Sequence, residues 1–201
     1  VLESMPTGAG KSIIYMAVAQ LLEARTLVLT ANKGLQQQLL GDFAIIGLTD
    51  IRGQGNYQCR ALSYKKGFHG CDQGPCHFGK ECEYHPRSEV YMAGCEFYDQ
   101  VRRARKAKLV VTNYSFWMSA NRYMGGGGTG LLGDFDLLIL DEAHDAADKL
   151  AEFCVVHLDR AECEEFLDAG LPPVEDGTDA WVSWATMHHA RLVAKVEHAK
   201  M

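Results

Sequence analysis

Residues 5–12 read MPTGAGKS and lead directly into the apolar segment IIYMAVAQLLEA (13–24). Gly8 and Gly10 permit a tight loop, and a glycine-rich loop that opens a helix can aim several backbone N–H groups at phosphate oxygens. The dipole of the helix adds positive potential at the same point. The stretch therefore predicts a phosphate-binding loop. The alternative is a glycine-rich strand-to-helix turn with an exposed lysine.

Each residue of this loop has an expected role. Lys11 is expected to reach the β- and γ-phosphates of a nucleotide, and the Ser12 hydroxyl is expected to occupy one position around Mg²⁺. Met5 stands where the strict G-x-x-x-x-G-K-[ST] pattern has its first glycine. The predicted nucleotide-binding residues are Pro6, Thr7, Gly8, Ala9, Gly10, Lys11 and Ser12.

A second motif is LLILDEAH (137–144), a hydrophobic strand pattern that ends in two carboxylates. We expect Asp141 to hold Mg²⁺ together with Ser12, and Glu142 to polarise the water that attacks the γ-phosphate of ATP. His144 is expected to couple the nucleotide state to neighbouring segments. The two motifs together predict a catalytic set, which comprises Lys11, Asp141, Glu142 and His144.

Hydrophobic periodicity along the chain predicts an α/β fold with a parallel sheet. Strands are expected at 26–30, 109–112 and 136–140, and helices at 10–24, 32–46, 96–108, 145–168 and 179–199. The first of these helices is apolar nearly all round, so we expect it to be buried against the sheet. Between 51 and 94 neither period is sustained, and a loop of that length needs something besides a hydrophobic core to order it.

The composition is that of a globular protein. Of the 201 residues 47% are hydrophobic and 23% are charged, which excludes disordered and coiled-coil classes. No apolar run reaches the roughly 18–20 residues of a membrane span, and no signal-peptide pattern opens the chain. We therefore expect no membrane partner and an intracellular location, cytoplasmic or nucleoid-associated, with a bacterial or phage origin.

The cysteines are strongly clustered. Five of the seven lie within 37 residues, at positions Cys59, Cys71, Cys76, Cys82 and Cys95. Nothing marks the chain as secreted, so a metal or iron–sulfur site is favoured over a disulfide framework. Structural zinc commonly uses C-x2-C pairs, which this segment lacks, although its histidines leave zinc open as the alternative. Cys154 and Cys163 lie on helical patterns and are expected to be core residues.

The same region carries the positive charge of an otherwise acidic chain. The net charge of the protein is −6, whereas residues 59–108 sum to +4. Cations that follow a nucleic-acid backbone, with aromatic rings on which bases stack, form a single-strand binding surface. The basic residues with this predicted role are Arg102, Arg103, Arg105 and Lys106. Their alternative role is the solvated face of a helix.

These motifs resemble the first motor domain of superfamily 2 DNA helicases of the DinG/XPD iron–sulfur type. The resemblance covers about residues 1–150 and includes GQGNYQC (53–59), CHFGKEC (76–82), CEFYDQVRR (95–103) and VVTNY (110–114). A non-glycine residue at position 5 is also what helicases show. In these helicases the first strand-contacting motif falls where this chain has Thr30, Asn32 and Gln36–Gln38.

The resemblance implies an ATP-dependent DNA helicase with 5′→3′ movement, which acts on single-stranded DNA and duplex junctions. It implies ATP, Mg²⁺ and a 4Fe–4S cluster as cofactors. The family spacing C-x4-C-x5-C points to Cys71, Cys76 and Cys82, whereas the aromatic segment makes Cys95 the last ligand. Cys59 fits the first ligand in both alignments. We favour Cys59, Cys76, Cys82 and Cys95, with Cys71 as a near-equal candidate.

The implied organisation is a RecA-like motor domain (1–50 and 96–149), an iron–sulfur insertion (51–95) and the start of a helical arch (150–201). The chain is expected to be a fragment that lacks the second RecA-like domain and therefore does not unwind duplex by itself. The rival hypothesis is a zinc-ordered, non-catalytic nucleic-acid-binding module with a vestigial nucleotide site. Iron and zinc analysis distinguishes the two.

Overall fold

A computed structural model describes residues 4–6, 8–122, 130–155 and 159–199 of the chain. The chain divides into two compact units, Val1–Cys154 and Val155–Met201. Within the described ranges, the helices are all too short or too polar to span a bilayer.

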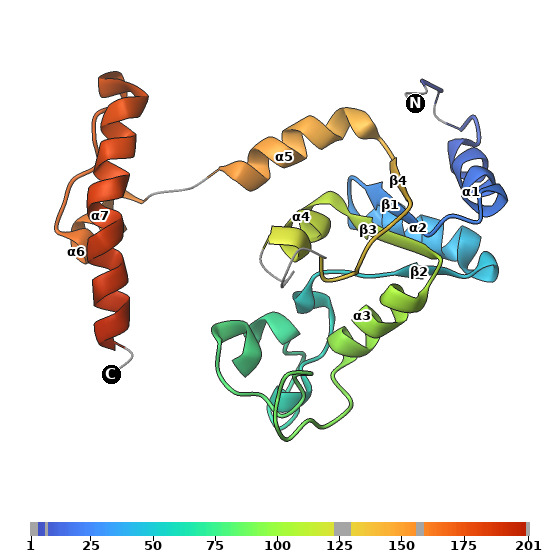
Figure 1. The fold of residues 1–201 in the computed structure, drawn as a ribbon, viewed down its shortest axis with the longest axis horizontal. Coiled ribbons are helices and arrows are strands. Elements are labelled where there is room, and N and C mark those ends of the chain that lie inside the picture. The colour runs from blue at the N-terminus through green and yellow to red at the C-terminus, as the bar shows by residue number, and fades with distance from the viewer. Residues whose placement is uncertain (1–3, 7, 123–129, 156–158, 200–201) are drawn as a thin grey trace. The chain divides into compact units, whose positions relative to one another are not determined.

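The first unit is built on a four-stranded sheet in the order β2-β3-β1-β4, with all neighbouring strands parallel (Figure 1). The strands are β1 (Thr26–Thr30), β2 (Leu48–Asp50), β3 (Leu109–Asn113) and β4 (Leu137–Leu140). The predicted parallel α/β sheet is confirmed. Sequence patterning missed β2, because this strand has three residues of which only Leu48 is fully buried.

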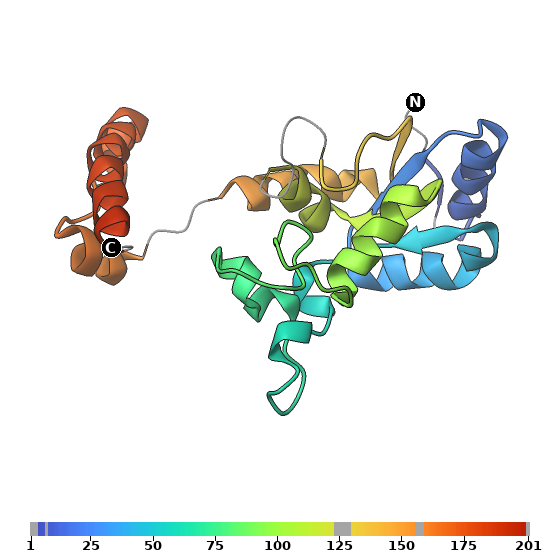
Figure 2. The same cartoon turned by 60° about the horizontal axis from the view of Figure 1, so that its bottom comes forward.

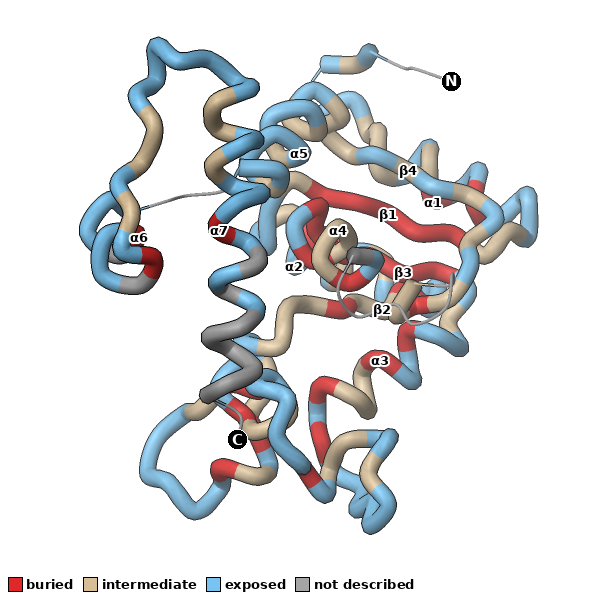
Figure 3. The backbone as a smooth tube through the Cα atoms, turned by 60° about the vertical axis from the view of Figure 1, so that its left-hand side comes forward, coloured by how far each residue is buried: buried red, intermediate tan, exposed pale blue. Residues whose placement is uncertain are grey.

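Alternate residues of the central strands face two separate cores. Val28 and Val111 pack on one face with residues of α1 and α2, whereas Leu27, Leu29 and Val110 pack on the other face with α3, α4 and the insertion. Strand β1 is buried along its whole length, as the tube in Figure 3 shows. The bounding helices are α1 (Lys11–Leu21), α2 (Lys33–Phe43), α3 (Glu96–Lys106), α4 (Tyr114–Arg122) and α5 (Ala146–Cys154).

Helix α1 is less buried than its composition predicted. Only Met16 and Ala19 are buried in it, while Ile13, Val18 and Leu21 are exposed. The helix therefore packs on the sheet through one narrow face, although its sequence is apolar nearly all round. Helix α4 was not expected at all, because its mixed polar and aromatic sequence has no clear period.

The insertion, residues 51–95, consists of short 3₁₀ turns and loops beside α3 (Figure 2). A single antiparallel bridge joins Gln58 and Gly70 among its described residues. Leu62 and three of the clustered cysteines pack into the core that the insertion shares with α3 and α4. The lack of periodic structure agrees with the sequence pattern.

The second unit contains α6 (Arg160–Leu167) and α7 (Gly177–Ala199). Cys163 is buried, as expected, whereas Cys154 at the end of the first unit is exposed, so that expectation is wrong. The segment between the two helices is held by Trp184, whose indole N–H donates to the Gly170 carbonyl at 2.9 Å.

Arg25, which directly precedes β1, links the end of α3 to the segment before β4 through hydrogen bonds. Its guanidinium donates to the carbonyls of Ala104 and Ala107 at the end of α3, at 3.2 and 3.3 Å. It also donates to the carbonyls of Leu132 and Asp134, in the segment that leads into β4. One side chain therefore joins three segments that are remote in sequence, and no sequence motif marked it.

We predict that Arg25→Met lowers the free energy of unfolding by roughly 2–3 kcal/mol, because hydrogen bonds from a charged donor are lost and several carbonyls lose their partner. Arg25→Lys should recover little, since an ammonium cannot reproduce the planar fork. Urea denaturation measures both, with the exposed Arg60→Met as the matched control. Equal stability of Arg25→Met and Arg60→Met would contradict this role.

Candidate nucleotide site

The two sequence motifs meet at one place in the structure. The phosphate loop precedes α1, and Asp141 and Glu142 follow the carboxyl end of β4. The Lys11 ammonium and a Glu142 carboxylate oxygen lie 3.1 Å apart, although 131 residues separate them in the chain. Both side chains are about a third exposed, so this ion pair is open to solvent and to ligand.

The backbone of the loop is arranged as the sequence predicted. Gly8 and Gly10 have φ of 82° and 80°, a conformation that side-chain-bearing residues rarely adopt. Gly10 forms the cap of α1, where its carbonyl accepts from the N–H groups of Ile13 and Ile14. The Ala9 N–H donates to the Pro6 carbonyl at 3.3 Å, and Ser12 lies in the first turn of α1, whereas Thr7 lies outside the described residues.

Glu142 has a strained backbone, with φ of 51° and ψ of 52°. A left-handed conformation at a residue other than glycine costs energy and is common at functional sites. In Glu142 this conformation turns the carboxylate back toward Lys11, just after the end of β4. His144 is exposed, and its ring nitrogens lie 3.4 Å from carboxylates of Glu142 and Asp145.

Asp141 is held by its backbone on two sides. Its N–H donates to the Leu29 carbonyl of β1 at 2.8 Å, and its carbonyl accepts from the Tyr114 hydroxyl at 3.1 Å. Burial, and then the neighbouring Glu142 carboxylate, raise the pKa of the Asp141 side chain. A partly desolvated carboxylate with an acidic neighbour gains from a cation, which suits the predicted Mg²⁺ role.

Tyr15 is a site residue that the sequence analysis missed. It lies one turn after Ser12 on α1, and its hydroxyl is buried with no hydrogen-bond partner of good geometry. Burial raises its pKa, and Ser12 and Asp141 are close enough to act on it as well. Tyr15 lies one turn after Lys11 and packs against the core beneath the sheet. A tyrosine at such a position is usually an ordinary core residue, so the sequence did not mark it as part of a site.

Part of the predicted strand-contacting motif has a structural role instead. Thr30 and Gln36 are fully buried, and the Gln36 amide donates to the Ile51 carbonyl at 2.9 Å. The Asn32 side chain caps α2 by accepting from the Leu35 N–H. Thr30 and Gln36 therefore help to hold α2 against the sheet, whereas Asn32, Gln37 and Gln38 are exposed.

All five cysteines of the insertion gather in one cluster. Four of them are buried and Cys76 is partly buried; the buried ones are Cys59, Cys71, Cys82 and Cys95. The N–H of Cys59 donates to the His69 carbonyl, and the N–H of Cys71 donates to the Tyr57 carbonyl. The segments around residues 57–59 and 69–71 therefore lie side by side. A Cβ added at Gly74 would lie 2.8 Å from the Cys59 sulfur, so only glycine fits there.

The thiols interact in two pairs. The Cys71 thiol donates to the Gln58 carbonyl at 3.5 Å, and its neighbour Cys95 raises the pKa of Cys71, while Cys71 lowers the pKa of Cys95. Backbone N–H groups at the start of α3 also favour the Cys95 thiolate. Burial, and then Cys82, raise the pKa of Cys76 to about 11.

The cysteine cluster does not have the geometry of a metal-binding site in this structure. Among the residues that the structure describes, no group of three or more Cys, His, Asp or Glu side chains is arranged to hold a metal ion. The described cysteines form no disulfide, and the clustered thiols lie close enough to shift one another's pKa. Sulfur is nevertheless the donor that iron–sulfur clusters and zinc both require.

Comparison with protein families identifies the fold. Residues 1–166 match the family described as "Type III restriction enzyme, res subunit", ResIII. The chain belongs to the ResIII family. ResIII is a superfamily 2 helicase-type domain, so the chain is an ATP-dependent, helicase-like motor domain. Comparison with curated proteins finds no match.

The family assignment agrees with the geometry of the ResIII domain. A phosphate loop, a DEAH tetrapeptide and a parallel sheet belong together in a helicase-type ATPase, and ATP and Mg²⁺ are its expected ligands. The match does not separate the DinG/XPD group from other superfamily 2 proteins.

We predict opposite effects for the two ends of the Lys11–Glu142 ion pair. Lys11→Ala should weaken Mg²⁺–ATP binding at least tenfold, because a charge-assisted contact with phosphate is lost. Glu142→Gln should leave binding unchanged or tighten it by at most about fivefold, since the partly exposed ion pair no longer competes for Lys11. Fluorescent-nucleotide titration measures both. Equal loss in the two variants would exclude this division of roles.

We predict that Tyr15→Phe raises the free energy of unfolding of the nucleotide-free domain by about 1 kcal/mol, because a buried hydroxyl without a partner is removed. Urea denaturation measures the change, and the exposed Tyr64→Phe serves as control. A loss of stability would show instead that the hydroxyl is bonded to Ser12 or Asp141.

Proposed function

We propose that the ResIII domain is the first motor domain of an ATP-dependent DNA helicase of the DinG/XPD iron–sulfur type. The observation that carries the proposal is the 3.1 Å contact between Lys11 and Glu142, which joins the phosphate loop to the DEAH segment. The clustered cysteines between these two segments support the finer assignment. The proposed activity is ATP hydrolysis coupled to movement along single-stranded DNA in the 5′→3′ direction.

In the proposed cycle, the incoming phosphates attract Lys11 away from Glu142. Ser12 and Asp141 would hold Mg²⁺, which supplies positive charge to the phosphate oxygens. Glu142, released from its ion pair, is then free to accept a hydrogen bond from the attacking water. Helicases complete this site with arginines from a second RecA-like domain, and that domain also provides the opening and closing motion needed for translocation.

We further propose that the insertion holds a 4Fe–4S cluster. The donor set fits, since five cysteines lie together and most are buried beside α3. Cys59, Cys76, Cys82 and Cys95 are the proposed ligands. Cys71 is the proposed spare, because the aromatic segment that follows Cys95 makes Cys95 the last ligand and displaces one of the others. Such a cluster would cross-link the loops of the insertion to the start of α3.

Single Cys→Ser variants test this assignment. Loss of a true ligand should remove iron and its visible absorption and should make residues 51–95 sensitive to protease, whereas Cys71→Ser should retain both. The exposed Cys154→Ser is the matched control. Iron in the protein purified without oxygen supports the helicase proposal. A colourless protein with one zinc supports the rival, a zinc-ordered binding module.

A further inference from the structure

The Tyr15 hydroxyl is a buried polar group that lacks a hydrogen bond. Its oxygen is shielded from solvent, and among the described residues no donor or acceptor meets it with good geometry. Such a hydroxyl costs free energy, because it has lost its hydrogen bonds with water and gained none from the protein. Phenylalanine would fill the same space without this cost. A role in packing therefore does not account for the hydroxyl, whereas a role in a site that a ligand or ion completes does.

The ring of Tyr15 is held by packing. Helix α1 is anchored on the sheet through Met16 and Ala19, which are both buried. The ring packs against the core to which these two residues belong, and Ile139 of β4 packs against the same core. Helix α1 and the strand that leads into Asp141 therefore share one packed core, and Tyr15 is part of it.

Two residues of the nucleotide site lie close to this hydroxyl. Burial raises the pKa of Tyr15, so the hydroxyl keeps a proton that it can donate, and the Ser12 and Asp141 side chains are close enough to act on the same pKa. The Asp141 backbone is held by the Leu29 carbonyl and the Tyr114 hydroxyl. Its carboxylate can still turn, because the terminal torsion of aspartate is broad, and the hydroxyl hydrogen of a tyrosine also rotates. Donor and acceptor can therefore be aligned without moving the backbone.

The missing bond belongs to the arrangement in which Lys11 is paired with Glu142. The proposed cycle ends that pairing when phosphates attract Lys11. A carboxylate that faces a cation is ionised and acts only as an acceptor, and an ionised acceptor makes the stronger hydrogen bond. The Tyr15 hydroxyl is thus expected to gain its partner at the step in which Asp141 meets Mg²⁺.

We propose that Tyr15 is a positioning residue of the nucleotide site, whose hydroxyl donates to the Asp141 carboxylate when the domain takes up Mg²⁺ and ATP. The inference rests on the proposed Mg²⁺ role of Asp141 and adds the residue that orients this carboxylate. Hydrogen bonds to a metal-ligating carboxylate fix its orientation, and their loss typically weakens metal binding tenfold or more.

The test is the effect of Mg²⁺ on the binding of N-methylanthraniloyl-ATP, titrated by fluorescence once with excess Mg²⁺ and once with EDTA. The ratio of the two dissociation constants isolates the contribution of the cation. Tyr15→Phe should weaken binding roughly tenfold in Mg²⁺, because the carboxylate loses the bond that orients it, and should leave binding in EDTA unchanged.

The matched control is Tyr64→Phe, which removes an exposed hydroxyl of the insertion and should change neither constant. Thermal unfolding verifies that the variants are folded. Tyr15→Phe is expected to be at least as stable as the unaltered chain, so weaker binding of this variant in Mg²⁺ does not arise from unfolding. A purely structural role of the ring would not change the ratio of the two constants.

A second arm tests whether Tyr15 acts through Asp141. Asp141→Asn alone should reduce the effect of Mg²⁺ on nucleotide binding. Adding Tyr15→Phe to Asp141→Asn should then cause no further loss, because the hydroxyl has lost the charged acceptor through which it acts. Residues that contribute independently would instead show losses that add.

The outcomes separate this inference from the proposed function. Equal weakening of Tyr15→Phe with and without Mg²⁺, or additive losses in the double variant, would overturn the inference. An Mg²⁺ effect that depends on Asp141 but persists unchanged in Tyr15→Phe would also overturn it and would leave the proposed role of Asp141 standing. Absence of nucleotide binding, or of any Mg²⁺ effect, in the unaltered chain would overturn both.

Discussion

The position of β1 between β3 and β4 is the constraint on which the rest of the ResIII domain depends. Its parallel register places Thr30 opposite Asn113 and Leu29 opposite Leu140. The carboxyl ends of three strands are thereby aligned, and the segments that follow them, with Asp141 and Tyr114, come together beside the phosphate loop. The Leu29 carbonyl extends this pairing by accepting from the N–H of Asp141. Glu142, whose backbone is strained, directly follows Asp141, and the sheet already fixes the position of Asp141.

The sequence predicted the elements that have a strong period or a motif, and it failed where neither exists. Strands β1, β3 and β4 and the loop around Gly8 and Gly10 follow from short apolar runs and from glycine conformations that few other residues adopt. Strand β2 is too short for a period, and Arg25 acts through backbone carbonyls that no side-chain pattern reveals. Gln36 shows the converse, since the family resemblance placed it in a strand-contacting motif, whereas its side chain is buried and donates to the Ile51 carbonyl.

The insertion is held together by other interactions than those that hold the sheet. It has few buried aliphatic residues, and its loops are held by backbone pairs such as Cys59 with His69 and by the packing of Gly74 against the Cys59 sulfur. A side chain at Gly74 would displace that sulfur. The sequence could therefore predict that cysteines order the segment, because neither helix nor strand period was present. It could not show which thiols pair, since that depends on turns with no sequence signature.

Aromatic rings of α3, α4 and the insertion pack around Phe97. Phe97 is almost completely buried, and its ring centroid lies 6.4 Å from that of Phe116, 5.7 Å from that of Tyr57 and 5.2 Å from that of Tyr98. Phe116 lies on the same helix as Tyr114, whose hydroxyl donates to the Asp141 carbonyl.

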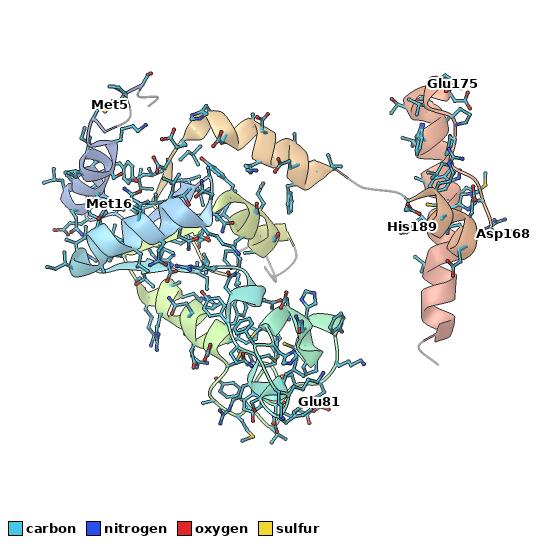
Figure 4. All side chains as sticks on the ribbon, turned by 180° about the vertical axis from the view of Figure 1, so that it is seen from behind. Met5, Met16, Glu81, Asp168, Glu175 and His189 are labelled. Carbon is cyan, nitrogen blue, oxygen red and sulfur yellow. The ribbon has the colours of Figure 1, made fainter. Side chains whose placement is uncertain are left out.

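Met5, before the phosphate loop, and Glu81, in the insertion, lie on opposite sides of the first unit (Figure 4). Contact alone does not establish energetic coupling between such distant sites. What the packing around Phe97 does establish is a constraint on α3: because Phe97 is almost completely buried against Phe116 of α4, α3 cannot move toward α4 without repacking that core.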